Sequence, residues 1–368
     1  MSVLDLFLEL AAMPSPPGEE RAVADRVAAE LRALGLQVDE DGAGTEIGSS
    51  AGNLYCRLKP TAEGTPLFLC AHLDTVPPVG TIEPVVEDGV VRNAGGTILG
   101  ADNKSAVAAM VEAARRIVQE RRPHAGLELV FTPKEEVGLR GAQAFDCGRL
   151  AARVGFVYDH AGPIGEVILG APHSRILEIT FRGRAAHAGM APEEGRSAIA
   201  AAARAIADMR LGRLDDETSA NVGTIAGGVA RNIVPDRCSF SAEARSHDES
   251  KLADVVQELL DACTFAASLT GCEVETRVER GFRGYRLRRD DEPVRLARAA
   301  LERTGHEPTF ALSGGGADAN VFNMRGLACL NLANGMAEIH SPQEHIAVAD
   351  LERMVDVTLA LVEEARAA

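Results

Sequence analysis

Strand and helix patterns alternate along the first part of the chain, and this alternation constrains the fold more than any other feature. Apolar runs of strand length include PLFLCAHLD, LELVFTP and RVGFVYDH. Helical periodicity separates them, at residues 19–34 and again from Asp102 to Glu120. Strands that alternate with helices indicate a mostly parallel sheet with helices on both faces. The expected fold class is therefore α/β.

The pattern changes between residues 174 and 283. There the order is strand, helix, strand, strand, helix, strand, which is typical of a split β-α-β unit with an antiparallel sheet. After residue 284 the α/β pattern returns, with helices expected at 291–304 and 349–366. We therefore expect a main domain made of 1–173 and 284–368. A ferredoxin-like α+β lid domain at 174–283 would interrupt it.

The chain of 368 residues is acidic, with 54 Asp and Glu against 38 Lys and Arg and a formal charge of −16. Its length also favours two domains, because one hydrophobic core rarely serves so many residues. An acidic chain has no excess of cations to neutralise phosphates. Nucleic acids and anionic membrane surfaces are therefore not expected as partners.

The seven cysteines are scattered and form no C-x-x-C pair. This distribution indicates neither a disulfide framework nor a cysteine zinc site. The N-terminal run MSVLDLFLELAAM lacks a basic segment, and no uncharged stretch approaches the ~18 apolar residues of a membrane span. We expect a cytoplasmic protein.

Histidine or acidic side chains stand where strand patterns end or a helix begins. They are His72, Asp74, Asp102, Glu135, Glu136, Asp159 and His340. Taken singly, each has an ordinary explanation as a surface histidine, a helix cap or a solvated loop charge. Together they favour one site, because ligands of open α/β sheets bind beyond the carboxyl ends of the strands. Imidazole and carboxylate donors without thiolate suit zinc or manganese, and two ions could share one carboxylate.

Four motifs carry a more specific resemblance: HLDTVPP, GTILGADNKSAVAAM, FTPKEEVGLRGA and RAAHAG. In this order they resemble the dizinc exopeptidase and deacylase family that includes peptidase T, carboxypeptidase G and succinyl-diaminopimelate desuccinylase. The peptidase T-like branch is the most similar. The resemblance extends over essentially the whole chain, lid included.

This resemblance implies two Zn²⁺ per subunit, with Co²⁺ or Mn²⁺ as substitutes. His72 and Asp159 match the terminal ligands of one ion, and Glu136 and His340 match those of the other. Asp102 matches the carboxylate that bridges the two ions.

The resemblance also assigns roles beside the metals. Asp74 would orient and polarise His72, and Glu135 would be the general base for a water that bridges the metals. His187 matches a lid histidine that stabilises the oxyanion in the active site of a partner subunit. The role of His160, next to Asp159, stays open.

Substrate contacts are implied at three further places. Asn232 and Arg245 match lid positions that contact substrate, the arginine through a carboxylate. The glycines of SGGGADAN, Gly314, Gly315 and Gly316, resemble a loop whose backbone approaches the ligand, although an ordinary glycine-rich turn explains them nearly as well.

The expected function is zinc-dependent hydrolysis of short peptides, similar to a tripeptide aminopeptidase. An N-acyl amino acid deacylase or a carboxypeptidase on the same dizinc scaffold is the alternative, because its metal ligands would be identical. A non-catalytic binding protein is a further alternative, which predicts a lost ligand or base, and none is lost. The expected assembly is a homodimer through the lid.

Overall fold

The computed structural model describes residues 2–367. This part of the chain divides into two compact units. The main unit runs to Ala171 and resumes at Arg286, and the inserted unit is Pro172–Tyr285. The main unit has the mostly parallel central sheet and the inserted unit has an antiparallel sheet, so the expected fold class is confirmed.

Within residues 2–367, the main sheet has nine strands in the order β1-β2-β6-β3-β7-β16-β8-β14, and β15 pairs with β8. Strands β6, β3, β7 and β16 are parallel to one another. The bounds are β1 (Val38–Glu40), β2 (Leu54–Leu58), β3 (Leu67–His72), β6 (Leu127–Thr132), β7 (Val154–His160), β8 (Glu166–Ala171), β14 (Tyr285–Arg286), β15 (Thr309–Leu312) and β16 (Ala328–Ala333).

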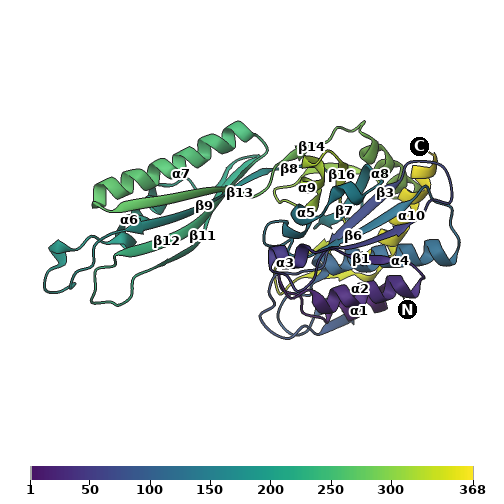
Figure 1. Cartoon of the computed structure of the whole chain (residues 1–368), viewed down its shortest axis with the longest axis horizontal. Helices are drawn as coiled ribbons and strands as arrows, with labels where there is room; N and C mark the ends of the chain where they lie inside the picture. Colours follow the sequence, from purple (N-terminus) through teal and green to yellow (C-terminus); the bar gives the residue numbers. More distant parts are fainter. Residues whose placement is uncertain (1, 368) are drawn as a thin grey trace. The chain divides into compact units, whose positions relative to one another are not determined.

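Helices cover both faces of this sheet (Figure 1). One layer is α1 (Val3–Ala11), α2 (Arg21–Ala33), α4 (Ala101–Gln119), α8 (Glu292–Arg303) and α10 (Val348–Ala367). The other is formed by α3 (Ala43–Ile47), α5 (Arg140–Ala144) and α9 (Asp318–Met324), with the 3₁₀ turn η1 (Cys147–Arg149) following α5 in the chain.

Alternate side chains of β3 serve these two layers, because successive residues of a strand point to opposite faces. Leu67 and Leu69 join the large core with α1 and α4. Phe68 faces the other way and packs against Phe322 of α9, with ring centroids 4.9 Å apart and the ring planes tilted by 58°. Helix α4 is buried on nearly every side through its first three turns, so it forms the centre of its layer.

A small second sheet has the order β17-β18-β5-β4. Its strands are β4 (Pro84–Glu87), β5 (Val90–Asn93), β17 (Met336–Ala337) and β18 (His345–Ala347). It brings the C-terminal segment that follows β16 beside the loop that precedes α4. None of the helices within residues 2–367 combines the length and apolar character needed to cross a lipid bilayer.

The inserted unit is an antiparallel sheet in the order β10-β11-β12-β9-β13, with α6 and α7 packed on it. Burial alternates along β12, which is the pattern of a sheet with one face in the core. The bounds are β9 (His173–Arg182), η2 (Pro192–Glu194), α6 (Ala198–Asp208), β10 (Gly212–Asp215), β11 (Thr218–Gly227), β12 (Arg237–Ser246), α7 (Glu249–Thr270) and β13 (Glu273–Arg280).

Candidate metal centre

Three parallel strands deliver the candidate side chains to one edge of the main sheet. His72 is the last residue of β3, Asp159 lies near the end of β7, and Glu135 follows the end of β6 by three residues. Because parallel strands end at the same edge of a sheet, these side chains meet there. Asp102 joins them from the first turn of α4, and His340 comes from the segment between β17 and β18.

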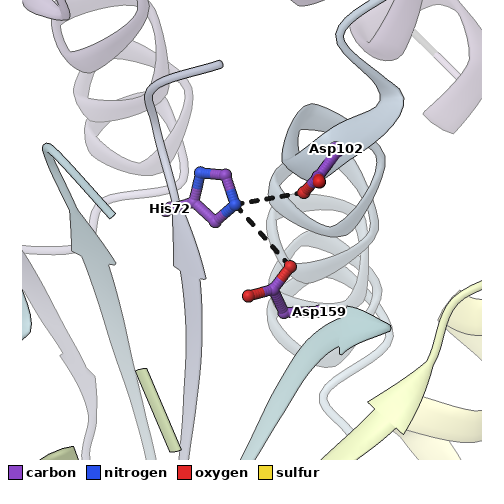
Figure 2. Close-up of side chains that lie close together, drawn as sticks. All are labelled: His72, Asp102 and Asp159. Carbon is purple, nitrogen blue, oxygen red and sulfur yellow. Dashed lines mark hydrogen bonds and ion pairs between the residues drawn. The ribbon is translucent and has the colours of Figure 1, made fainter. Parts of the chain in front are cut away.

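The first cluster consists of His72, Asp102 and Asp159 (Figure 2). The Nε2 atom of His72 lies 3.1 Å from Oδ1 of Asp102 and 3.7 Å from Oδ1 of Asp159. The candidate ligand atoms all lie within 4.8 Å of one another. One imidazole nitrogen and two carboxylate oxygens therefore surround one small space.

The second cluster consists of Asp102, Glu136 and His340. The Nε2 atom of His340 lies 3.0 Å from Oε1 of Glu136 and 3.3 Å from Oδ2 of Asp102. Asp102 thus turns one carboxylate oxygen to each cluster. A carboxylate shared between two sets of nitrogen and oxygen donors fits a pair of divalent cations such as Zn²⁺ or Mn²⁺.

Asp74 positions the backbone of the two adjacent glutamates. Its carboxylate accepts the N–H of Glu135 at 2.9 Å and the N–H of Glu136 at 3.1 Å. The ring of His72 makes its shorter contact, 2.8 Å from Nδ1, with the backbone carbonyl of Asp74 rather than with the carboxylate at 3.5 Å. Nδ1 donates to that carbonyl, so loss of the proton on Nε2 would leave a lone pair directed at the first cluster.

Glu135 differs from its neighbour in its surroundings. It is buried, and within residues 2–367 no donor is hydrogen-bonded to its carboxylate. Burial, followed by the charge of Asp159, raises the pKa of Glu135 well above the ordinary value. Glu136, in contrast, is hydrogen-bonded to His340. The adjacent glutamates therefore have different environments.

Protons are shared unequally among the remaining groups. Burial and the charge of Asp102 raise the pKa of Asp159 to about 7. Burial would also raise the pKa of Asp102, but hydrogen bonds from His340 and His72 lower it overall. Hydrogen bonds to Asp102 and Glu136 raise the pKa of His340 to about 10. In the absence of cations, bound protons therefore reduce the net negative charge of this site.

Glu344 is a buried residue of the site that the sequence analysis missed. Its carboxylate accepts the N–H groups of Leu99 and Gly100 at 2.8 Å each, and that of Asp102 at 2.9 Å. These bonds fix the backbone that carries the shared carboxylate. Its nearness in sequence to His340 is the one signal that the sequence offered.

Asn331 of β16 is a second missed residue. Its side-chain oxygen accepts the N–H of Asp159 at 2.9 Å, and its amide nitrogen donates to the carbonyl of Asp159 at 2.8 Å. This reciprocal pair fixes the backbone of Asp159. His160 belongs to neither cluster: its Nε2 lies 3.8 Å from Glu166, and burial lowers its pKa.

His187 and Asn232 lie side by side in the inserted unit, and both are exposed. The N–H of Ala188 donates to the carbonyl of Asn232 at 2.9 Å. The Nδ1 atom of His187 accepts the N–H groups of Gly189 and Met190, each at 3.2 Å. Since Nδ1 is an acceptor, a neutral ring carries its proton on Nε2 and can donate it outward.

Arg245 lies at the other end of the same sheet. It pairs with Ser174 at the start of β9, whereas His187 follows Arg182 at the end of that strand. The eight steps from Ser174 to Arg182 along β9 span ~26 Å at ~3.3 Å per residue. Arg245 is bonded to Glu243 at 2.9 Å and lies over the ring of Phe282. The inserted unit therefore separates Arg245 from His187 and Asn232.

The glycine loop links β15 to α9 in the main unit. A Cβ added to Gly314 would meet no atom within 4 Å, so open space lies beside this backbone. The N–H of Gly315 donates to Oγ of Ser313 at 3.0 Å.

The chain is similar to known proteins over nearly its whole length. The sequence model of peptidase family M20/M25/M40 matches residues 68–364. An uncharacterised protein of Bacillus subtilis, YqjE, is 38% identical over 363 residues, which cover 99% of this chain and 98% of that protein.

Two solved structures are similar over nearly their whole length. The aminopeptidase PepT of Bacillus cereus is 38% identical, with a TM-score of 0.86 and coverage of 99% of this chain and 98% of that one. A tripeptidase of Staphylococcus aureus is 34% identical, with a TM-score of 0.92 and coverage of 100% and 98%.

Proposed function

The chain belongs to peptidase family M20/M25/M40, and we propose that it is a dizinc aminopeptidase that cleaves tripeptides and other short peptides. The observation that carries the proposal is the carboxylate of Asp102, shared by two donor clusters, beside the buried and unpaired Glu135. The names of the similar solved structures, an aminopeptidase and a tripeptidase, favour peptides over N-acyl amino acids as substrates.

Two zinc ions per subunit are the proposed cofactors, and Co²⁺ or Mn²⁺ could replace them. His72 and Asp159 would hold one ion, Glu136 and His340 the other, and Asp102 both. Two cations bound there would lower the pKa of the attacking water and polarise the scissile carbonyl. The cost of gathering four carboxylates in one buried space supports this assignment, because opposite charge is needed to offset their repulsion.

Glu135 is the proposed general base. It accepts the proton of the attacking water and gives it to the amine nitrogen of the leaving group. Its burial beside both clusters, with no donor among residues 2–367 bonded to its carboxylate, supports this role because its oxygens are free to accept a proton. Asp74 positions it by accepting its backbone N–H.

Substrate contacts are proposed at the glycine loop and on the inserted unit. The open space beside Gly314 lets the backbone of Gly314 and Gly315 approach a peptide. Arg245 offers a planar fork to a substrate carboxylate, with Glu243 holding the fork in place. Asn232 offers an exposed amide.

A substrate panel tests the proposed function. The zinc-loaded protein should release the N-terminal residue from tripeptides such as Leu-Gly-Gly, with kcat/KM at least about 100-fold higher than for N-acetyl or N-succinyl amino acids. Product identification by mass spectrometry distinguishes N-terminal from C-terminal cleavage. Preferential hydrolysis of the N-acyl compounds would assign the deacylase alternative, and release of the C-terminal residue would assign a carboxypeptidase.

We further propose a homodimer joined through the inserted unit, in which His187 serves the site of the partner subunit. Helix α7 exposes Phe265 and Leu269, one turn apart, which supports an apolar interface. A tripeptide is far shorter than the ~26 Å that separates Arg245 from the end of β9. If His187 and Arg245 both contact one substrate, they therefore come from different copies. In the site of the partner subunit, His187 would stabilise the negative charge that develops on the oxygen of the scissile carbonyl.

Subunit mixing tests action across the dimer. Proteins with His187→Ala and with Glu135→Ala should each be inactive alone. Under conditions that exchange subunits, each mixed dimer then holds one site with both defects and one with neither. Activity should return toward half per mixed dimer. No recovery after verified exchange would place His187 in its own subunit's site, and sedimentation as a monomer would exclude the dimer.

A cytoplasmic location is also proposed. All seven cysteines are free thiols, as is typical of proteins from reducing compartments.

A further inference from the structure

A large cavity in the main unit lies away from the metal centre. It has a volume of about 1170 Å³ and is lined by residues of β1, β2, η1 and the C-terminal end of α4. Leu58, in its wall, pairs with the first residue of β6, whereas Glu135 follows the last. Along α4, Val118 in the wall is separated from Asp102 by ~24 Å at ~1.5 Å per residue. The cavity is therefore at the opposite edge of the sheet.

The charges that line this cavity, which we call the basic pocket, differ in sign from the chain as a whole. Five are cationic and one is acidic: Arg57, Lys59, Arg121, Arg122, Arg149 and Asp39. The whole chain has a formal charge of −16. An excess of cations in one concave region of an acidic protein creates a local positive potential that attracts anions.

Two of these cations lack a compensating acid. Arg149 pairs with Asp39 at 3.1 Å, Arg57 with Glu128 at 3.7 Å, and Arg122 with Glu120 at 2.7 Å. Arg122 also reaches Glu363 at 3.2 Å. Lys59 and Arg121 form no ion pair with any residue from 2 to 367. Two uncompensated positive charges therefore border the pocket.

A buried histidine, His124, also lines the basic pocket. The backbone of His124 is hydrogen-bonded to Thr61. The N–H of His124 donates to Oγ1 of Thr61 at 3.0 Å, and the N–H of Thr61 donates to the carbonyl of His124 at 2.8 Å. The ring lines the pocket and is only 5% exposed, yet its Nδ1 atom has no hydrogen-bond partner among the described residues. Nδ1 itself has no accessible surface, but Nε2 is accessible and also lacks a hydrogen-bond partner among residues 2–367. Nε2 is therefore the atom that can bond to a ligand in the pocket.

The backbone at Arg121 is a further unusual feature. Its φ is +52°, at a position just after α4 where helices usually end in glycine. A side chain in this conformation is less favourable than glycine. The residue in this conformation is nevertheless an arginine, and it lines the pocket.

We propose that the basic pocket binds a small organic phosphate, a phosphate monoester with an apolar or planar body. The phosphate dianion pairs with Arg121 and Lys59, and the ring of His124 supplies a hydrogen bond. Leu36, Leu58 and Val118 provide apolar wall against which the body packs. The volume is sufficient for a ligand of nucleotide size.

Calorimetric titration with AMP tests the proposal on the zinc-loaded protein. AMP should bind the wild type with a Kd below about 1 mM, and adenosine and inorganic phosphate should each bind about tenfold more weakly or worse. Arg121→Gly and Lys59→Gln should each weaken AMP about tenfold. Arg121→Gly suits the positive φ and should keep the wild-type melting temperature and peptidase activity. Arg298→Gln is the matched control, because it removes an exposed cation of α8 and should leave AMP affinity unchanged.

Several results would overturn the proposal. One is the absence of AMP binding to the wild type at 10 mM, on the order of the weakest specific affinities. Equal affinity of AMP for the wild type and Arg121→Gly would assign binding to another place, including the metal centre. Adenosine binding as tightly as AMP would show that the phosphate is not recognised. An equal loss of AMP affinity in Arg298→Gln would show that the effect comes from the net charge of the protein and not from the pocket. None of these results bears on peptide hydrolysis.

Discussion

Glu135→Gln should lower kcat for peptide hydrolysis by about 10²–10⁴-fold or more while the metal content stays at its wild-type value. Glutamine has nearly the same shape but cannot accept the proton of the attacking water. Glu135 contributes no oxygen to either donor cluster, so its replacement should leave the metal ligands intact. It also removes a buried carboxylate that its neighbours disfavour, so thermal stability should be unchanged or higher.

The neighbouring residue gives the matched control. Glu136→Gln changes a member of the second cluster, 3.0 Å from His340, and should lower both activity and metal content. Metal analysis of the dialysed variants together with kcat on a tripeptide separates the two outcomes. If Glu135→Gln empties the site as Glu136→Gln does, the division of roles between the two glutamates is wrong.

Removal of the metals should abolish activity, and their return should release protons in a manner that depends on pH. The pKa of Asp159 in the metal-free site is raised to about 7, and that of His340 to about 10. Both groups must lose their protons before they bind a cation. Near pH 6 Asp159 therefore releases its proton together with the two histidines, whereas near pH 8.5 only His340 and His72 do so. For His72, burial would lower the pKa, but hydrogen bonds to Asp102 and Asp159 outweigh it and raise the pKa well above the ordinary value. Fewer protons are released as pH rises, and metal affinity increases with pH throughout this range.

Calorimetry in two buffers of different ionisation enthalpy measures this release directly. After chelation and dialysis, zinc is titrated into the protein at each pH. Metal at about 100 times its Kd should also add ~2.7 kcal/mol to the free energy of unfolding, which a rise in melting temperature reports. Proton release that is zero, or that grows from pH 6 to pH 8.5, would contradict the arrangement of protonated groups described above.

The fold could be predicted because its signals are local. Periodicity separated α2, α4, α8 and α10 from the strands, and the change of pattern near residue 174 marked a different architecture. The convergence of His72 and Asp159 followed from one rule, that parallel strands end at the same edge of a sheet, and Asp102 was indicated by its place at the start of a helix. The resemblance to a known family supplied His187 and Arg245, which no local pattern indicates.

The supporting bonds could not be predicted because they depend on three-dimensional placement. Glu344 is 242 positions from Asp102 in the chain, and only the pairing of β18 with β5 brings them together. The carboxylate of Asp74 lies 3.5 Å from Nδ1 of His72 and also accepts two N–H groups from the turn after β6, which no sequence pattern indicated. The basic pocket is lined by several segments between β1 and η1, and in the sequence each of them has the pattern of an ordinary charged surface.

The position of Glu344 and His340 near the end of the chain has a consequence for biosynthesis. A growing polypeptide exposes His72, Asp102, Glu136 and Asp159 long before the ribosome has made residue 340. Until then the nascent chain lacks one donor of the second cluster, and the segment that carries Asp102 lacks the carboxylate that fixes it. Domains fold as units during synthesis, and the metal centre of this unit is completed only after residues 340–344 have been made. A chain truncated before residue 340 would therefore be left without a complete hydrolytic centre.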